Sequence, residues 1–148
     1  MSTYIKGAFE ISTDKGRLQL NVIHKYLSEE AYWCKNIPLE TVAKSIEHSC
    51  CFGLYHKEEQ IGFARVITDY ATYSYLADVF ILQIYRGRGL SKWLVQTIME
   101  HPALQGMRKW VLGTRDAHGL YAKYAGFTPL KEPGKFMELH FPDIYKPG

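Results

Sequence analysis

The stretch that decides the fold is Tyr85-Arg86-Gly87-Arg88-Gly89-Leu90-Ser91. It separates an apolar segment with the pattern of a strand from one in which apolar residues recur at helical spacing. Residues 75–82 before it are rich in aromatic and β-branched side chains, which predicts a buried strand. After it, apolar residues recur at helical spacing from Leu90 to Ile98, which predicts an amphipathic helix. The order strand, glycine-rich turn, helix brings unpaired N–H groups to the positive end of a helix dipole. We therefore expect an anion-binding site at this junction.

Three glycine-rich phosphate motifs compete for this stretch. A Walker A loop places Lys and Ser/Thr directly after its last glycine, whereas Gly89 is followed by Leu-Ser-Lys. A dinucleotide fingerprint needs a third glycine where Lys92 stands. The pattern R-x-x-G-x-G/A fits better, with Arg86, Gly89 and, at the last position, Ser91.

The rest of the chain predicts one α/β domain over residues 1–148, with antiparallel hairpins early and alternating strands and helices later. The elements expected before the central stretch are a strand at 8–11, helices from Leu20 to about Ser28 and from Pro38 to about His48, and a hairpin of 50–55 with 60–67. Those expected after it are a strand at 110–114, a helix at 117–125 stopped by Gly126, and closing strands at 127–130 and 136–140.

Composition narrows the class of protein. Hydrophobic residues make up 47% and charged residues 22%, which is typical of a soluble globular chain. The net charge of +3 is small and the basic residues are scattered, so we expect no nucleic-acid partner. No apolar run predicts a membrane span or a secretory signal. Three cysteines without a C-x-x-C pair and six dispersed histidines predict no metal site and a cytoplasmic, reducing location.

Two motifs in the same order resemble the GNAT superfamily of acyl-CoA-dependent N-acetyltransferases. Residues 85–90 match its Tyr-Arg-Gly-x-Gly-Leu turn, and residues 117–123 match its A-x-x-L-Y-x-K helix, which ends here in Gly126-Phe127. The resemblance is strongest from Tyr75 to Phe127. It implies a mixed, mostly antiparallel central sheet with splayed central strands, flanked by about four helices, and acetyl-CoA as co-substrate. The coenzyme-binding residues that it implies are Phe80, Ile81, Arg86, Gly87, Arg88, Gly89, Leu90, Ser91 and Lys123.

In that family, backbone N–H groups of the turn hold the coenzyme A pyrophosphate. The strand before the turn is then expected to part from its neighbour near Phe80-Ile81, so that its open edge pairs with the pantetheine arm. The acyl group would enter the wedge between the strands. Two positions depart from the family's pattern: Ser91 replaces the usual Gly or Ala, and Thr114 stands where many members carry an asparagine near the coenzyme.

The resemblance also implies a tyrosine that protonates the departing thiolate, and Tyr121 is its match. One residue more than usual separates Tyr121 from Gly126, which predicts a bulged or loosened helix end, with Tyr124 as the alternative donor. Asp78 is an acid in an apolar strand, which is costly unless it is paired or faces a cleft. Asp78 is therefore a candidate base, a ligand for a cationic acceptor, or the ion-pair partner of Arg115 or Arg65.

The predicted function is transfer of an acetyl group from acetyl-CoA to a primary amine by direct attack, without a metal. The acceptor would be a small-molecule or peptide amine. The oligomeric state stays open, with a homodimer, which is common in the family that the chain resembles, as the candidate. Tyr32 and Trp33 are candidates for a lid over the acceptor. Two other classes remain open, a non-catalytic acyl-CoA-binding sensor or scaffold and a phosphate-binding regulatory domain.

Overall fold

A six-stranded sheet forms the centre of the computed structural model, which describes residues 1–147; Gly148, the last residue of the predicted domain, lies outside the described residues. The strands are adjacent in chain order: β1 (Thr3–Lys6), β2 (Phe9–Ser12), β3 (Cys50–His56), β4 (Glu59–Thr68), β5 (Tyr73–Ile81) and β6 (Lys109–Leu112). Each pair is antiparallel except β5 with β6, which is parallel. The predicted mixed, mostly antiparallel sheet is confirmed.

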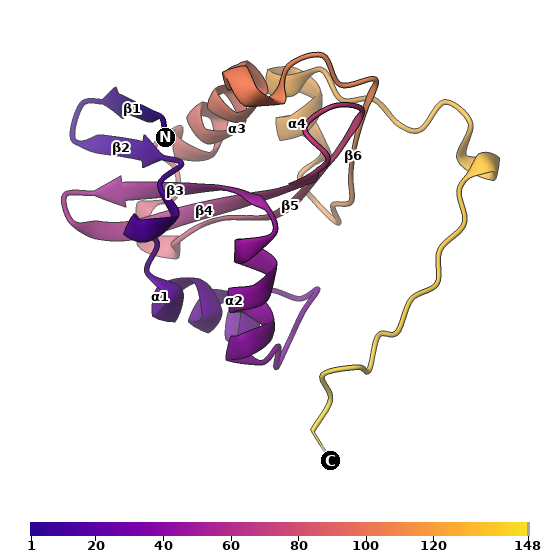
Figure 1. Ribbon diagram of the computed structural model, residues 1–148, viewed down its shortest axis with the longest axis horizontal. Coiled ribbons are helices and arrows are strands. Elements are labelled where there is room, and N and C mark those ends of the chain that lie inside the picture. Colours follow the sequence, from indigo (N-terminus) through magenta and orange to yellow (C-terminus); the bar gives the residue numbers. More distant parts are fainter. Residues whose placement is uncertain (148) are drawn as a thin grey trace.

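Two pairs of helices cover opposite faces of the sheet (Figure 1). On one face lie α1 (Leu20–Lys25), which continues into a π-helical turn (Tyr26–Glu30), and α2 (Leu39–Glu47). On the other face lie α3 (Leu90–Glu100) and α4 (His118–Ala125). About four helices were predicted, and residues 1–147 contain four α-helices. None of the helices described for residues 1–147 has the length and apolarity that crossing a membrane would require.

Each pair of helices buries its own apolar stripe against the sheet. In α3, Leu94, Val95 and Ile98 are fully buried, at the helical spacing that the sequence showed. On the opposite face, Ile23 of α1 and Val42 of α2 are fully buried in a second cluster. The sheet is therefore covered by apolar side chains on both faces. Its backbone N–H and C=O groups can be reached by a ligand only at the edges and where neighbouring strands part.

Strand β5 carries a bulge and then loses one neighbour. Phe63 of β4 lies opposite Phe80, but Arg65 lies opposite Ala77, so β5 contains one extra residue between these pairs. Asp78 in the bulge has a left-handed backbone, with φ of 53°. Strands β5 and β6 pair only up to Leu76 with Leu112. The predicted splaying of the central strands is confirmed, and it begins earlier along β5 than Phe80-Ile81.

The two predicted closing strands are wrong for this chain. Residues 127–130 and 136–140 form no strand, and only a short 3₁₀ turn (Pro133–Lys135) lies between them. Figure 1 shows the C-terminal segment running away from the sheet. A strand needs a neighbour to satisfy its backbone groups, and neither segment lies against one in its own chain. Pro129, inside the first segment, also removes one of the N–H donors that a ladder would use.

Candidate active site

The predicted anion site is an open cradle of backbone N–H groups. Gly87 and Gly89 have φ of 81° and 74°, a left-handed conformation that glycine adopts without strain. Within residues 1–147, the N–H groups of residues 87–92 donate no hydrogen bond. They lie beside a cavity of about 160 Å³ at the start of α3, which is lined by Ile81, Tyr85, Arg86, Gly87, Gly89, Leu90 and Ser91. Successive free donors at a helix N-terminus suit a phosphate.

Arg86 connects this cradle to a second, larger cavity. Its own N–H is occupied by the carbonyl of Gln83 at 3.1 Å, so the free donors begin at Gly87. Its guanidinium points inward, where Nε donates to the carbonyl of Ile81 at 3.0 Å and Nη2 donates to the hydroxyl of Tyr26 at 2.9 Å. The side chain lines both cavities. The guanidinium of Arg86 therefore lies between the backbone N–H cradle and the larger cavity.

The edge of β5 offers a backbone donor between the two cavities. Leu82 donates its N–H to Ile61 of β4 at 2.8 Å, so the N–H and C=O of Ile81 point away from β4 by the alternation of an antiparallel ladder. That side is open because β6 has already diverged. Phe80 faces the other way: its side chain is 3% exposed and stacks on Tyr26 with ring centroids 4.0 Å apart. Of the two predicted positions, Ile81 is the one available to a ligand.

The remaining cations of the predicted coenzyme site gather around aromatic rings. Arg88 lies 5.3 Å from the ring centroid of Tyr85. Lys92 and Lys123 lie 4.8 Å and 5.4 Å from the ring centroid of Tyr124. Lys123 of α4 is thereby held near the first turn of α3, beside the cradle. Tyr124 contacts these lysines and is not among the residues that line the larger cavity, which leaves Tyr121 as the better placed of the two tyrosines.

The larger cavity, of about 630 Å³, opens where β5 and β6 part. Its lining comes from the α1–α2 connection, from β4 and β5, from the end of β6 and from α4, and includes Tyr26, Glu30, Tyr32, Trp33, Arg65, Asp78, Gly113, Thr114, Arg115, Asp116 and Tyr121. The sequence indicated Tyr32 and Trp33 as candidates for this wall, but it gave no signal for Tyr26. The hydroxyl of Tyr32 accepts the backbone N–H of Arg115 at 3.0 Å, which ties the lid residues to the start of α4.

Tyr121 projects from α4 into this cavity and is 8% exposed. Its hydroxyl makes no hydrogen bond with residues 1–147. Burial, and to a lesser degree the nearby Tyr32, raises the pKa of Tyr121 to about 12. The phenol therefore keeps its proton at neutral pH and directs an unused donor into the cavity.

The predicted loosening of the α4 end is confirmed. The carbonyl of Tyr121 accepts the N–H groups of both Gly126 and Phe127, which are five and six residues ahead instead of the usual four. Gly126 closes the helix with φ of 76°, and the ring of Phe127 packs 6.1 Å from that of Tyr121. The extra residue is thus absorbed after Tyr121, and the tyrosine keeps its position relative to Ala117.

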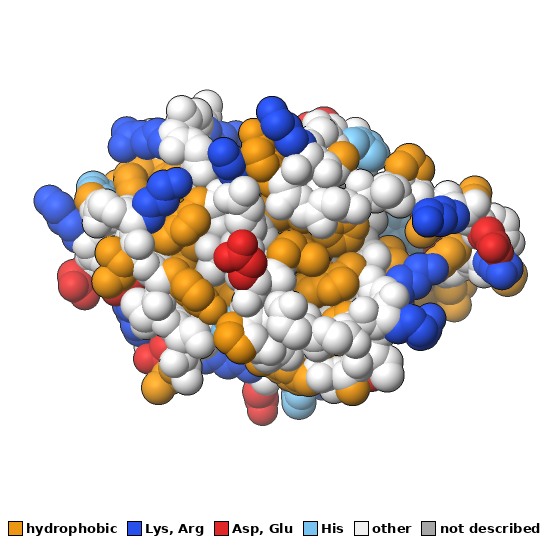
Figure 2. Space-filling view, turned by 90° about the horizontal axis from the view of Figure 1, so that it is seen from above, with side chains coloured by type: hydrophobic (Ala, Val, Ile, Leu, Met, Phe, Trp, Pro, Cys, Tyr) orange, Lys and Arg blue, Asp and Glu red, His pale blue; other side chains and the backbone are white. Residues whose placement is uncertain are grey.

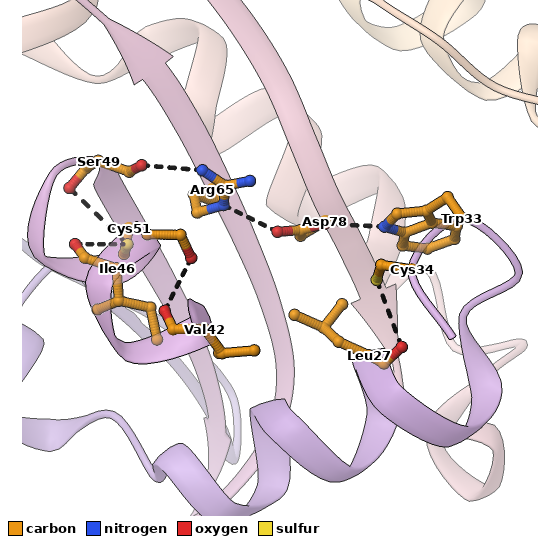
Figure 3. Close-up of polar contacts among 10 residues, drawn as sticks. Leu27, Trp33, Cys34, Val42, Ile46, Ser49, Cys51, Arg65 and Asp78 are labelled. Atoms are coloured by element: carbon orange, nitrogen blue, oxygen red, sulfur yellow. Dashed lines mark hydrogen bonds and ion pairs between the residues drawn. The ribbon is translucent and has the colours of Figure 1, made fainter. Parts of the chain in front are cut away.

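Asp78 is held by two side chains from separate parts of the chain (Figure 3). Arg65 Nε lies 2.8 Å from one carboxylate oxygen, and Trp33 Nε1 donates to the other at 2.8 Å. A second nitrogen of Arg65 donates to Ser49 at 3.1 Å. Arg115, the other predicted partner, stacks on the ring of Tyr32 instead. Because both oxygens of Asp78 are engaged, the carboxylate is better suited to fixing the cavity wall than to taking a proton.

No group of three or more histidine, cysteine or acidic side chains in residues 1–147 is arranged to hold a metal ion.

Comparison with known proteins agrees with this geometry. Residues 20–127 match the model of the Acetyltransferase (GNAT) family. A Gibberella zeae protein assigned by name to the acetyltransferases is 32% identical over 151 residues, which cover 87% of this chain and 84% of that protein. A structure from Xanthomonas campestris pv. campestris, assigned by its description to the GNAT family, is 50% identical, with a TM-score of 0.91 over 94% of this chain and 97% of that chain. A Clostridium acetobutylicum acetyltransferase solved with acetyl-CoA shares the fold, with a TM-score of 0.66 and 15% identity over 89% of this chain and 94% of that chain. The chain therefore belongs to the GNAT family of acetyltransferases.

Proposed function

We propose that the protein is an N-acetyltransferase that moves an acetyl group from acetyl-CoA to a primary amine by direct attack. The observation that carries the proposal is the pairing of two adjoining cavities. One contains a run of free backbone donors, the other contains an unpartnered tyrosine hydroxyl, and Arg86 lines both. A phosphate-bearing donor and an amine acceptor need this combination.

In this proposal, the N–H groups of residues 87–92 bind the coenzyme A pyrophosphate, and Lys123 adds positive charge beside them. The outward N–H of Ile81 pairs with an amide of the pantetheine arm, as an added strand would. The thioester then lies in the wedge between β5 and β6, where backbone N–H groups stabilise the carbonyl oxygen as it gains negative charge.

Tyr121 is the proposed general acid. As the amine attacks, the new C–N bond forms and the C–S bond breaks, so one proton must leave nitrogen and one must reach sulfur. An ordinary thiol has a pKa of about 8.5, so the phenolate of a phenol with a pKa of about 12 is a stronger base than a thiolate and does not persist beside the thiol; transfer to sulfur therefore requires that Tyr121 regains a proton in the same step. We propose that Tyr121 gives its proton to sulfur and regains one from the cationic nitrogen, which balances the reaction without a separate base.

Asp78 takes a positioning role in this scheme. Its carboxylate joins Arg65 of β4 to Trp33 of the α1–α2 connection and so fixes the wall against which the acceptor would lie. The acceptor is proposed to be a small-molecule or peptide amine, since Glu30 and Asp116 add acidic groups to a lining that also holds Tyr32 and Trp33. A cytoplasmic location and a homodimer complete the proposal; the three free cysteines fit the former.

The test is release of free coenzyme A from acetyl-CoA in the presence of polyamines, amino acids, aminoglycosides and peptides, with mass spectrometry of the acylated product. Acceleration by one class of amine supports the proposal. If no amine accelerates the release of coenzyme A although calorimetry shows that coenzyme A binds, the proposed acetyltransferase activity is wrong. The protein would then be a non-catalytic acyl-CoA-binding module.

A further inference from the structure

The sheet has one uncovered face beyond the bulge in β5. Within residues 1–147, the apolar cluster under α1 and α2 includes Phe63 of β4 and Phe80 of β5 but no residue of β6. The other side, which Figure 2 shows from above, is covered by α3 and α4, and lysine and arginine side chains stand around its rim. The part of β5 that pairs with β6 is therefore covered on the side of α3 and open on the side of α1 and α2.

Ile67 of β4 and Tyr75 of β5 lie on this open face. They are opposite each other across the two strands, and the chain neighbours Val66 and Leu76 are buried in the cluster under α3. Since side chains alternate along a strand, the pair points to the open face. Ile67 and Tyr75 are 44% and 36% exposed, and both line the larger cavity. A Cβ atom placed on Gly113 would lie 3.4 Å from the Tyr75 hydroxyl, so this ring reaches the end of β6. We call Ile67 and Tyr75 the apolar strip.

The lid residues Tyr32 and Trp33 add ring surface to the same cavity. Each is 43% exposed, although its polar atom is engaged. Trp33 Nε1 donates to Asp78 at 2.8 Å, and the Tyr32 hydroxyl accepts the backbone N–H of Arg115 at 3.0 Å. The two rings pack edge to face with their centroids 5.0 Å apart. What a ligand meets on these two side chains is therefore mostly ring carbon, held in a fixed orientation.

The lid residues and the apolar strip together leave a large apolar surface uncovered. At exposed fractions of 36–44%, four side chains of this size present roughly 350 Å². An exposed apolar patch of this extent beside a cavity marks a ligand site. A ligand with an apolar body gains free energy by covering this surface, whereas a small amine without such a body leaves it in water.

The charges of the larger cavity balance. Among residues 1–147, its charged lining consists of three cations and three anions, which are Arg65, Arg86, Arg115, Glu30, Asp78 and Asp116. Arg65 and Asp78 form an ion pair, which leaves two of each sign. A polyamine or an aminoglycoside carries several positive charges and needs an excess of anions to offset its loss of water. A balanced cavity instead suits an acceptor with a single amine.

We propose that the acceptor is an aralkylamine, a primary amine joined to an aromatic ring by a short alkyl chain. The proposal rests on the proposed acetyltransferase function and names the class of amine that it uses. The aromatic ring lies against the lid residues and the apolar strip, where ring-to-ring contacts add to the burial of apolar surface. The alkyl chain carries the amine toward Tyr121, which lines the same cavity. A cavity of about 630 Å³ has room for such a molecule.

The first experiment compares kcat/KM for phenethylamine and tryptamine with kcat/KM for ethylamine, spermidine and the aminoglycoside kanamycin. Covering one aromatic ring should raise kcat/KM for phenethylamine by about 10- to 150-fold over ethylamine. Spermidine and kanamycin should be used no better than ethylamine. If either polycation has a higher kcat/KM than phenethylamine, the aralkylamine proposal is wrong, although the acetyltransferase function stands.

Calorimetry separates this proposal from the proposed function. Phenethylamine is titrated into the protein saturated with coenzyme A, so that binding is measured without acetyl transfer. We expect its Kd to be at least about tenfold below that of ethylamine. If phenethylamine binds in this way but no amine is acetylated, the ring-binding site is supported and the proposed acetyl transfer is wrong. If amines are acetylated but phenethylamine binds no tighter than ethylamine, the aralkylamine proposal fails.

Substitution of Tyr75 tests the position of the ring. Tyr75→Ala removes roughly 80 Å² of exposed ring surface, so kcat/KM for phenethylamine should fall roughly 30-fold, and that for ethylamine by less than about threefold. Tyr75→Phe keeps the ring and should retain the preference for phenethylamine. Tyr73→Ala is the matched control, because Tyr73 is also 36% exposed, lies two residues earlier in β5 and does not line the cavity.

Ile67→Asn provides a second variant of the apolar strip and should lower kcat/KM for phenethylamine more than that for ethylamine. Thermal unfolding of each variant shows whether the fold is retained. An equal loss for phenethylamine and ethylamine in both strip variants would overturn the proposed position of the ring. So would a loss in Tyr73→Ala as large as that in Tyr75→Ala.

Discussion

Replacing Ser91 by glutamate should move stability and coenzyme binding in opposite directions. Ser91 is the second residue of α3, is partly exposed and lines the smaller cavity. A carboxylate in the first turn of a helix favours folding, because the N-terminal end of the helix dipole is positive. The same carboxylate would lie where the coenzyme A phosphates are proposed to bind.

The two effects differ in size. The added helix–charge interaction is worth about 0.3–1 kcal/mol, or a rise in Tm of about 1–3 °C for a chain of this length. Repulsion from each of two phosphate charges at roughly 5 Å costs about 1–2 kcal/mol in a partly exposed site. The combined cost of about 2–4 kcal/mol corresponds to roughly 30- to 800-fold weaker coenzyme A binding.

Isothermal titration with coenzyme A and thermal unfolding of the free protein measure the two quantities. Ser91→Ala is the matched control, because it keeps a small side chain and adds no charge; its Kd should change less than threefold. If Ser91→Glu binds coenzyme A as tightly as the unaltered protein, the phosphates do not lie in this cradle. A fall in Tm would instead show that the first turn of α3 is not free to accept an anion.

Three further substitutions or titrations test the rest of the site. Tyr121→Phe should lower kcat by about 10²- to 10³-fold with the Kd for acetyl-CoA unchanged within twofold, because only the proton donor is lost; unchanged kcat would exclude the phenol. Asp78→Asn keeps the shape of the side chain but removes its charge, and so breaks the ion pair with Arg65. The two side chains are 10% (Asp78) and 17% (Arg65) exposed, so the free energy of unfolding measured in urea should fall by about 2–4 kcal/mol. A fall of less than about 0.5 kcal/mol would show that the pair does not stabilise the fold. Burial raises the pKa of Tyr55 and Tyr121 to about 12, whereas a tyrosine in the unfolded chain has a pKa of about 10. Between pH 10 and pH 12 the unfolded chain therefore loses these protons while the folded chain keeps them. The free energy of unfolding should fall over this range by about 1 kcal/mol per pH unit for each phenol. Urea titrations from pH 9 to 11 check this slope, which Tyr121→Phe should lessen; an equal slope in the variant would contradict the assignment.

The sequence predicted the elements whose pattern is local. The hairpin of β3 and β4, helix α2 and the strand–turn–helix around Tyr85 were each predicted within a few residues, because periodicity and turn residues report burial directly. The turn at Gly87 and Gly89 was also readable, since positive φ there requires glycine. The loosened end of α4 followed from counting residues between Tyr121 and Gly126.

What the sequence did not predict depends on contacts between distant segments. Strand β1 has no apolar alternation of its own and forms as the hairpin partner of β2. Tyr26 enters the site because a π-helical turn at the end of α1 places its ring on Phe80, and no local pattern indicates that meeting. The closing strands were predicted from a local strand pattern, but such a pattern does not show whether a neighbouring strand is available to pair with.

The bulge at Asp78 has a consequence for how this strand can vary. Leu76 and Phe80 are four residues apart and would share a face in a regular strand, yet Leu76 packs under α3 and Phe80 under α1 and α2. The one extra residue shifts the phase of β5, so a single strand supplies both cores in turn. The number of residues in the strand at this point therefore decides which of the two cores each later side chain enters. An insertion or deletion between Ala77 and Val79 would exchange the inward and outward side chains of everything that follows, the coenzyme edge included, while many substitutions there would leave the phase intact.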